Sequence, residues 1–347
     1  MKPAASPGAG ELEWATPHAI ALELPTMRLR DFSTAPPGPS AGRAALICGP
    51  FALHGANVAD FAPGHSVVET LRQAGLGRVH VTDWRSATAR MRDFGIDNYL
   101  ADLNVAVDEI GPADLIGICQ GGWLALLYAA RFPGKVGRLV IAGAPVDIEA
   151  GQSELSQLAN SYPIEVYENL VRLGDGVVQG QRTLQMWTSA SLAATRADDI
   201  LQLPLTTGAA ERAALASRFE AWNAATVDLP GAYYLEVVNQ LYRQNRIVRG
   251  EFVALGHRID LAALRTPLYL LVGHDDKVVA PQQLLAIASQ VGTPRESIRT
   301  VEAPCGHLSL FMGHETLTGI WTDIARWLME HPVLPAAGPL AVGIAET

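Results

Sequence analysis

Short apolar runs separated by helical patterns extend over most of this chain. The runs predict buried strands at residues 44–48, 78–84, 114–116, 138–143, 266–273 and 298–301. Apolar residues at helical spacing fall between them, at 65–75, 97–110, 123–130 and 281–291. Strands that alternate with helices in this way predict an α/β fold, with a mostly parallel, doubly wound sheet and helices on both faces.

This alternation is interrupted between residues 151 and 250. That stretch is helical by pattern, rich in Ala, Leu, Gln and aromatic residues, and contains no convincing strand. Its position between two core strands predicts an inserted helical cap over the strand ends. The predicted organisation begins with an N-terminal arm at 1–42 that contains one or two edge strands. The core follows in two parts, at 43–150 and 251–331, on either side of the cap at 151–250. A flexible tail rich in Pro, Gly and Ala, at 332–347, ends the chain.

Composition excludes several classes of protein. Hydrophobic residues make up 49% of the chain and charged residues 18%, which allows a sizeable core and excludes global disorder. The net charge is −9 and the 26 basic residues are scattered, which argues against a nucleic-acid partner. No apolar run reaches the roughly 18 residues of a membrane span, and residues 1–7 lack the apolar stretch of a signal peptide.

The three cysteines, Cys48, Cys119 and Cys305, are an odd number and have no metal-ligand spacing. They predict a reducing, cytoplasmic location. No nucleotide-binding glycine motif, Walker motif or HExxH motif occurs. We therefore expect neither a cofactor nor a metal.

The segment from Gly117 to Gly122 carries the strongest chemical signal, with the sequence GICQGG between a predicted strand and a predicted helix. A G-x-nucleophile-x-G turn at such a junction is typical of the nucleophile elbow of the α/β-hydrolase fold. Glycine is needed on either side because a Cβ would collide within so sharp a turn. Cysteine stands at the nucleophile position, so Cys119 predicts acyl transfer through a thioester.

A cysteine nucleophile needs a base, and the base needs an orienting acid. Both follow in the order that this fold predicts. Asp276 comes three residues after a strand-ending glycine, and Asp275 is an alternative that spacing alone does not exclude. His307 follows Gly306 after the last strand. We expect His307 to accept the thiol proton and Asp276 to fix the imidazole tautomer.

The acyl oxyanion needs two N–H donors. We expect the backbone amide of Gln120 to be one, and an amide of the turn at 49–54, with Phe51 as the candidate, to be the other. Three side chains are candidates for substrate contact, namely His54, Trp123 and Tyr233. We expect Cys48 to serve in core packing. Cys305 is close to His307 in the sequence; we expect it to pack in its loop, with a functional role as the alternative.

The nucleophile segment resembles the catalytic box of the polyhydroxyalkanoate synthases, in which a cysteine carries the growing polyester. Residues 83–87 (DWRSA), 96–100 (IDNYL) and 144–147 (APVD) are similar to segments of both these synthases and the intracellular polyhydroxyalkanoate depolymerases. Residues 227–235 (VDLPGAYYL) and 305–313 (CGHLSLFMG) look more like the depolymerases, which also use a Cys–Asp–His triad. The resemblance extends from about residue 45 to residue 328.

Three positions depart from the two patterns. Synthases typically have His after the catalytic Asp and Thr after the paired glycines, where this chain has Lys277 and Trp123. Depolymerases commonly have Pro after Cys-Gln, where this chain has Gly121. The motifs therefore specify the family and leave the direction of the reaction open.

The resemblance implies an enzyme that acts on hydroxyalkanoate esters through a thioester on Cys119. We expect first a depolymerase-like ester hydrolase, and as the alternative a synthase that polymerises 3-hydroxyacyl-CoA. A third hypothesis is a granule-associated protein without catalysis. The expected partners are a polyester or hydroxyacyl ester substrate, a granule surface and a second copy in a homodimer.

Overall fold

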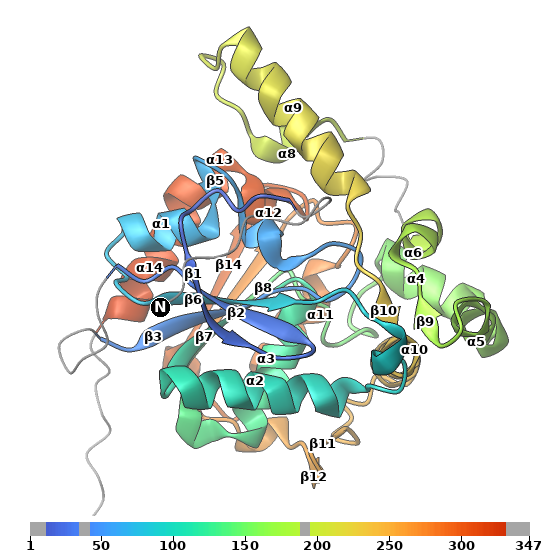
Figure 1. Ribbon diagram of the computed structural model, residues 1–347. Helices are drawn as coiled ribbons and strands as arrows, with labels where there is room; N and C mark the ends of the chain where they lie inside the picture. The colour runs from blue at the N-terminus through green and yellow to red at the C-terminus, as the bar shows by residue number, and fades with distance from the viewer. Residues whose placement is uncertain (1–11, 35–41, 188–194, 331–347) are drawn as a thin grey trace, which may run out of the picture.

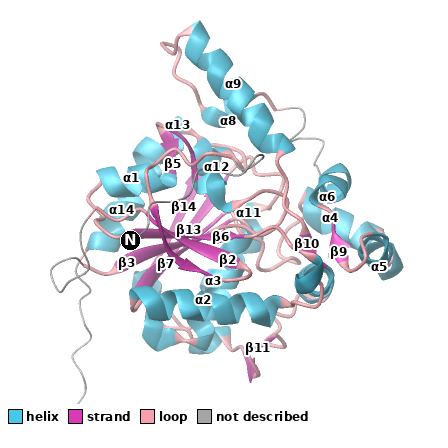
Figure 2. Ribbon diagram, in the orientation of Figure 1, coloured by secondary structure: helices cyan, strands magenta, loops and turns pink. Residues whose placement is uncertain are grey.

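A sheet of eight strands forms the centre of the computed structural model, which describes residues 12–34, 42–187 and 195–330 (Figures 1 and 2). Its strand order is β1-β2-β6-β3-β7-β8-β13-β14. Six strands run parallel to one another, and they are β3 (Ala44–Cys48), β6 (Val79–Trp84), β7 (Ala113–Ile118), β8 (Val136–Ala142), β13 (Leu268–Gly273) and β14 (Ile298–Ala303). This arrangement confirms the predicted mostly parallel sheet.

Two antiparallel strands extend one edge of the sheet. They are β1 (Ala19–Glu23) and β2 (Met27–Asp31), and β2 pairs with β6. They are the edge strands that the sequence placed in the N-terminal arm. Other parts of that arm, residues 1–11 and 35–41, and the predicted tail at 332–347 lie outside the described residues.

Helices cover both faces of the sheet because successive strand residues point to opposite sides. In β3, Leu46 and Cys48 face one hydrophobic cluster, whereas Ala45 and Ile47 face the other. The first cluster includes residues of α2 (Ile96–Ile110), α3 (Gln120–Arg131) and α11 (Pro281–Leu285); the second includes residues of α1 (Val67–Gln73), α12 (Ser309–Met312) and α14 (Thr322–Met329). A parallel sheet buried on both faces explains the continuous apolar runs.

Two predicted helices are shorter in the structure than the sequence pattern indicated. The helix expected at 65–75 begins at Val67, because His65–Ser66 forms the strand β5 and pairs with β4 (Asp60–Ala62). Ser66 Oγ caps this helix by accepting a hydrogen bond from the Glu69 N–H at 2.9 Å. The helix expected at 281–291 is α-helical only through Leu285 and continues as the 3-10 helix η6 (Ala286–Ser289).

The stretch between β8 and β13 is mostly helical. It contains α4 (Glu154–Ser161), α5 (Ile164–Leu173), α6 (Gly180–Trp187), α8 (Ala197–Leu201), α9 (Ala209–Ala224), α10 (Gly231–Glu236) and the π-helix η4 (Val237–Arg243). A two-residue strand pair, β9 (Val177–Val178) with β10 (Leu229–Pro230), lies in this region, where no strand was predicted. In Figure 1, α8 and α9 project from the top of the molecule.

The end of this helical insertion is bound to loops of the core by backbone hydrogen bonds. The Val227 N–H donates to the Leu53 carbonyl at 3.0 Å, and the Tyr233 N–H donates to the Phe94 carbonyl at 3.0 Å. Near its beginning, the Glu154 N–H donates to the Lys277 carbonyl at 3.0 Å. The insertion is therefore fixed to the loops that follow β3, β6 and β13, at the carboxyl ends of the parallel strands.

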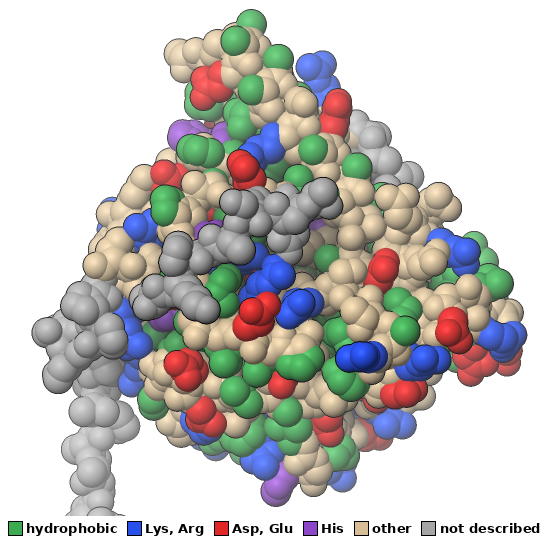
Figure 3. Space-filling model, in the orientation of Figure 1, with side chains coloured by type: hydrophobic (Ala, Val, Ile, Leu, Met, Phe, Trp, Pro, Cys, Tyr) green, Lys and Arg blue, Asp and Glu red, His purple; other side chains and the backbone are tan. Residues whose placement is uncertain are grey.

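Short elements complete the described fold. They are β11 (Val253–Ala254), β12 (His257–Arg258), α13 (His314–Thr316), the π-helix η8 (Leu317–Trp321) and the 3-10 helices η1 (Ala56–Ala59), η2 (Ala89–Met91), η3 (Pro133–Lys135), η5 (Leu261–Ala263) and η7 (Arg295–Ser297). Acidic and basic side chains are interspersed on the face seen in Figure 3. Within the described ranges, every helix is too short or too polar to span a membrane.

Candidate active site

Cys119 occupies the sharp turn between β7 and α3. Its backbone has φ 50° and ψ −130°, a conformation that a residue with a side chain rarely adopts. The turn is held by two hydrogen bonds, from the Cys119 N–H to the Ala142 carbonyl at 2.9 Å and from the Gly122 N–H to the Cys119 carbonyl at 3.0 Å. Strain maintained in this way at a tight turn is typical of a functional residue.

The flanking glycines are required by close backbone contacts. A Cβ on Gly121 would lie 2.0 Å from the Cys48 carbonyl oxygen, and a Cβ on Gly117 would lie 2.4 Å from the Gly122 Cα. Neither contact could be relieved by a side-chain rotation, since both involve backbone atoms. The glycine spacing that marked this segment in the sequence thus has a steric cause.

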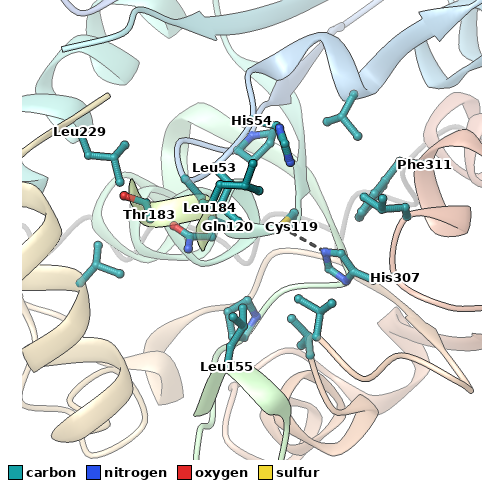
Figure 4. A pocket seen from close by; sticks show the side chains of 18 of the residues that line it. Leu53, His54, Cys119, Gln120, Leu155, Thr183, Leu184, Leu229, His307 and Phe311 are labelled. Carbon is teal, nitrogen blue, oxygen red and sulfur yellow. Dashed lines mark hydrogen bonds between the residues drawn. The ribbon is translucent and has the colours of Figure 1, made fainter. Parts of the chain in front are cut away.

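Three side chains from separate loops meet at the carboxyl edge of the sheet. The His307 Nε2 lies 3.3 Å from the Cys119 Sγ, and the His307 Nδ1 lies 2.7 Å from the Asp276 Oδ2 (Figure 4 shows the first contact). His307 comes from the loop after β14 and Asp276 from the loop after β13. Asp275 is exposed, and it is Asp276 that contacts the imidazole.

Asp276 is itself held in place. Its Oδ1 accepts the N–H groups of Val278 and Val279 at 2.9 and 2.8 Å, which leaves Oδ2 directed at the imidazole. Burial alone would disfavour a charged His307, but the Asp276 carboxylate and the Cys119 sulfur outweigh it and raise the pKa of His307 well above its ordinary value. The site is therefore built to stabilise an imidazolium beside the sulfur.

The other two cysteines lie in surroundings that favour the neutral thiol. Burial raises the pKa of Cys48 to about 12 and that of Cys305 to about 11. Thr316 Oγ1 lies 3.6 Å from the Cys305 Sγ. These environments agree with the packing role predicted for both residues.

A cavity of about 310 Å³ opens beside the sulfur (Figure 4). Cys119, Gln120 and His307 line it together with the turn after β3. Most of the remaining wall is apolar and includes side chains of the helical insertion, among them Leu155, Leu184, Trp222, Leu229, Tyr233, Val238 and Tyr242. Such a cavity suits an apolar acyl chain with few polar groups.

The predicted substrate contacts separate into two groups. His54 and Tyr233 line the cavity. Trp123 does not, which corrects that prediction: only 1% of it is exposed, and its ring stacks 6.4 Å from that of Tyr233, within the core. Trp123 lies in the first half of α3 and belongs to the hydrophobic cluster that covers this face of the sheet.

The Phe51 side chain also belongs to the core, with its ring 4.8 Å from Tyr99 and 5.2 Å from Tyr233. Its neighbours Pro50 and Ala52 line the cavity. The backbone of this turn thus runs along the cavity while the phenyl ring anchors the turn below it. Gln120 is the first residue of α3, where N–H groups have no partner within a helix.

Two cavity residues, Leu155 of α4 and Tyr242 of the π-helix η4, gave no signal in the sequence. Apolar and aromatic residues are common throughout the insertion, and only the packing of its helices determines which of them face the sulfur. Among the described residues, no group of three or more His, Cys, Asp or Glu side chains could hold a metal ion.

A family model described as "Protein of unknown function (DUF3141)" matches residues 104–325, which is more than half of the chain. The chain belongs to this family. The matched region includes the elbow, the helical insertion and the loops of Asp276 and His307.

Curated relatives carry a more specific name. The chain is 28% identical over 285 residues to "Poly(3-hydroxyalkanoate) polymerase subunit PhaC" of Synechocystis sp., covering 78% of this chain and 74% of that protein. It is 24% identical over 311 residues to the protein of the same name from Haloferax mediterranei, covering 82% of this chain and 57% of that protein. These relatives confirm the predicted resemblance to the polyhydroxyalkanoate synthase branch.

Solved structures confirm the fold. A monoacylglycerol lipase of Paleococcus ferrophilus superposes with a TM-score of 0.56 at 14% identity, covering 87% of this chain and 98% of that one. A soluble variant of monoglyceride lipase from Saccharomyces cerevisiae has a TM-score of 0.57 at 12% identity, covering 92% and 96%. The fold is that of the α/β hydrolases, as the elbow predicted.

Proposed function

We propose that this protein is an acyl-transfer enzyme that holds a 3-hydroxyacyl unit as a thioester on Cys119. The observation that carries the proposal is the continuous contact from the Cys119 Sγ through His307 to Asp276, with separations of 3.3 and 2.7 Å, at the wall of an apolar cavity. Nucleophile, base and orienting acid in this order are the elements of covalent acyl transfer.

In the proposed first step, His307 Nε2 accepts the thiol proton while the sulfur attacks the acyl carbonyl carbon. The tetrahedral intermediate collapses as the bond to the leaving group breaks, and the imidazolium returns the proton to that group. In the second step His307 deprotonates a water molecule or a hydroxyl, which attacks the thioester and releases the Cys119 thiol. Asp276 stays ionised and stabilises the imidazolium throughout.

The proposed oxyanion donors are backbone amides. The Gln120 N–H lies at the amino end of α3, where the helix dipole also favours a negative charge. The second donor would come from the turn after β3. Pro50 has no N–H, so the candidates beside the cavity are the predicted Phe51 and its neighbour Ala52.

Two directions of reaction share this chemistry. The names of the relatives, whose matches cover most of this chain, favour polymerisation of a hydroxyacyl thioester. The depolymerase-like hydrolysis expected first from the sequence rests on two segments, 227–235 and 305–313. On this balance we rank synthesis above hydrolysis. We propose that the helical insertion acts as a cap, and that the access of water to the thioester beneath it decides between the two reactions. A granule surface and a homodimer remain predictions.

Product analysis of the purified protein tests the proposal. The protein is given 3-hydroxybutyryl-CoA and, separately, amorphous polyhydroxybutyrate granules. Release of CoA with growth of polymer would support synthesis, and release of free hydroxy acid or short oligomers from granules would support hydrolysis.

Variants of Cys119 are the matched controls. Cys119→Ala should remove either activity while leaving a folded chain, and Cys119→Ser should retain only weak activity, because this site activates a thiol rather than a hydroxyl. Full activity in a folded Cys119→Ala variant, or the absence of any acylated Cys119 in the wild-type protein, would contradict the proposed function.

A further inference from the structure

A second histidine, His54, lies at the cavity wall outside the Cys119–His307–Asp276 contact. Its ring packs against Trp222 of α9 with centroids 4.2 Å apart, and only 2% of Trp222 is exposed. In the view of Figure 4, the Cys119 sulfur lies between the imidazoles of His54 and His307. The two histidines thus line the same cavity as Cys119 and come from different loops, which follow β3 and β14.

The hydrogen bond of His54 fixes its tautomer. Its Nδ1 lies 3.1 Å from the carbonyl oxygen of Ala225, and a carbonyl can only accept, so Nδ1 carries the hydrogen. In a neutral imidazole the other nitrogen, Nε2, then has a lone pair and accepts.

The environment keeps this imidazole neutral. Burial lowers the pKa of His54, and its bond to the Ala225 carbonyl only partly opposes that effect. His307 differs because a carboxylate faces it and raises its pKa. His54 is therefore a hydrogen-bond acceptor at neutral pH, whereas His307 is suited to carry a proton.

An acceptor in an apolar wall is unfavourable unless a donor meets it. Backbone contacts also keep His54 at this place: Ala225 follows α9, and two residues later Val227 donates to the Leu53 carbonyl next to His54. A ring held by the core loop on one side and by the insertion on the other has little freedom to change its orientation.

We propose that His54 Nε2 accepts a hydrogen bond from the hydroxyl of the acyl unit held at Cys119, so that His54 selects hydroxyacyl over plain acyl substrates. This inference rests on the proposed function, because it assumes an acyl group on Cys119. It assigns His54 to substrate recognition and leaves proton transfer to His307.

The test measures how fast Cys119 is acylated by 3-hydroxybutyryl-CoA and by butyryl-CoA, which differ only in the hydroxyl. In each case the Cys119–acyl thioester forms as the CoA thiol is released, and mass spectrometry of the intact protein reads the product. The ratio of the two rates is the quantity of interest. Because butyryl-CoA lacks the hydroxyl that would donate to His54 Nε2, this ratio should be about tenfold or more in the wild-type protein.

Three variants of His54 separate recognition from packing. His54→Asn can still donate to Ala225 but does not reach the position of Nε2, and His54→Phe retains a ring against Trp222 without either nitrogen. Both should bring the ratio close to one. His54→Gln, whose amide oxygen can reach the Nε2 position, should recover part of the preference. The control is His257→Asn, an exposed histidine in β12 that does not line the cavity and should leave the ratio unchanged.

The outcomes distinguish this inference from the proposed function. If His54→Asn and His54→Phe slow the acylation of Cys119 equally for both substrates, the ratio of the rates is preserved. That outcome would make His54 a structural residue and overturn the inference. A wild-type protein that forms both thioesters at the same rate would also overturn it while leaving the Cys119 chemistry intact. Failure of the wild-type protein to form either thioester would overturn both.

Discussion

At the scale of single residues, the site depends on which of two adjacent carboxylates faces the imidazole. Asp275 and Asp276 are chemically identical and differ only in the direction of their side chains. Asp276 is buried and has its Oδ1 occupied by two backbone N–H groups, whereas Asp275 is exposed. A carboxylate held in this way loses little further freedom when the imidazole gains its proton.

This difference predicts unequal effects of the same substitution. Asp276→Asn should slow acylation of Cys119 by about 100-fold or more, because the amide stabilises the imidazolium poorly and can favour the wrong tautomer. Asp275→Asn should leave the rate within about twofold. The rate of thioester formation measures both, and equal losses in the two variants would contradict the assignment of Asp276.

At the scale of elements, the strand–turn–helix unit of β7, Cys119 and α3 is fixed by backbone contacts. The Cys48 carbonyl at the end of β3 lies where a Cβ of Gly121 would be. The elbow therefore depends on the neighbouring strand as well as on its own sequence. A tight strand–helix crossing of this kind tolerates no added atom at this position.

Gly121→Ala should consequently lower the free energy of unfolding by about 3 kcal/mol or more, or prevent folding, since backbone must move to admit the methyl group. The matched control is Gly134→Ala in η3, where an added Cβ meets no atom within 4 Å. Gly134→Ala should alter the free energy of unfolding by no more than about 0.5 kcal/mol. Urea unfolding of the two variants compares them, and a Gly121→Ala protein as stable as the control would refute the steric argument.

At the scale of the whole molecule, the Asp276–His307 pair joins the loops that follow β13 and β14 and so contributes to global stability. The folded state raises the pKa of His307, so it holds the imidazole proton more tightly than the unfolded chain does. The stabilisation is fully present below the ordinary histidine pKa near 6.5. It is lost as pH rises through the higher pKa of the folded state.

We therefore expect the stability advantage of the wild-type protein over His307→Gln to be larger at pH 6 than at pH 9. Urea unfolding at the two pH values measures it. Cys119→Ala is the control. In this variant Asp276 still faces His307 and still raises its pKa, so the variant should retain part of the pH dependence of stability. An advantage that grows toward pH 9 would show that His307 is neutral in the folded protein at pH 6.

Much of this architecture could be predicted because it depends on local chemistry. Buried parallel strands must be apolar on both faces, which made the core strands visible as continuous runs. The elbow needs glycine on both sides of Cys119, which made this candidate nucleophile visible as a spacing. The helix predicted at 65–75 shows the limit of prediction from local patterns. It begins at Val67 because His65–Ser66 pairs with β4, a contact that the helical pattern does not encode.

The sequence by itself thus determined the fold class and the order of the candidate nucleophile, acid and base, because each follows from constraints between near neighbours in the chain. Only the tertiary structure decided that Asp276 rather than Asp275 faces His307, that Trp123 lies in the core, and that His54 and Tyr242 line the cavity. Those outcomes depend on the direction of individual side chains where segments distant in sequence meet. Packing sets that direction, and a linear pattern does not contain it.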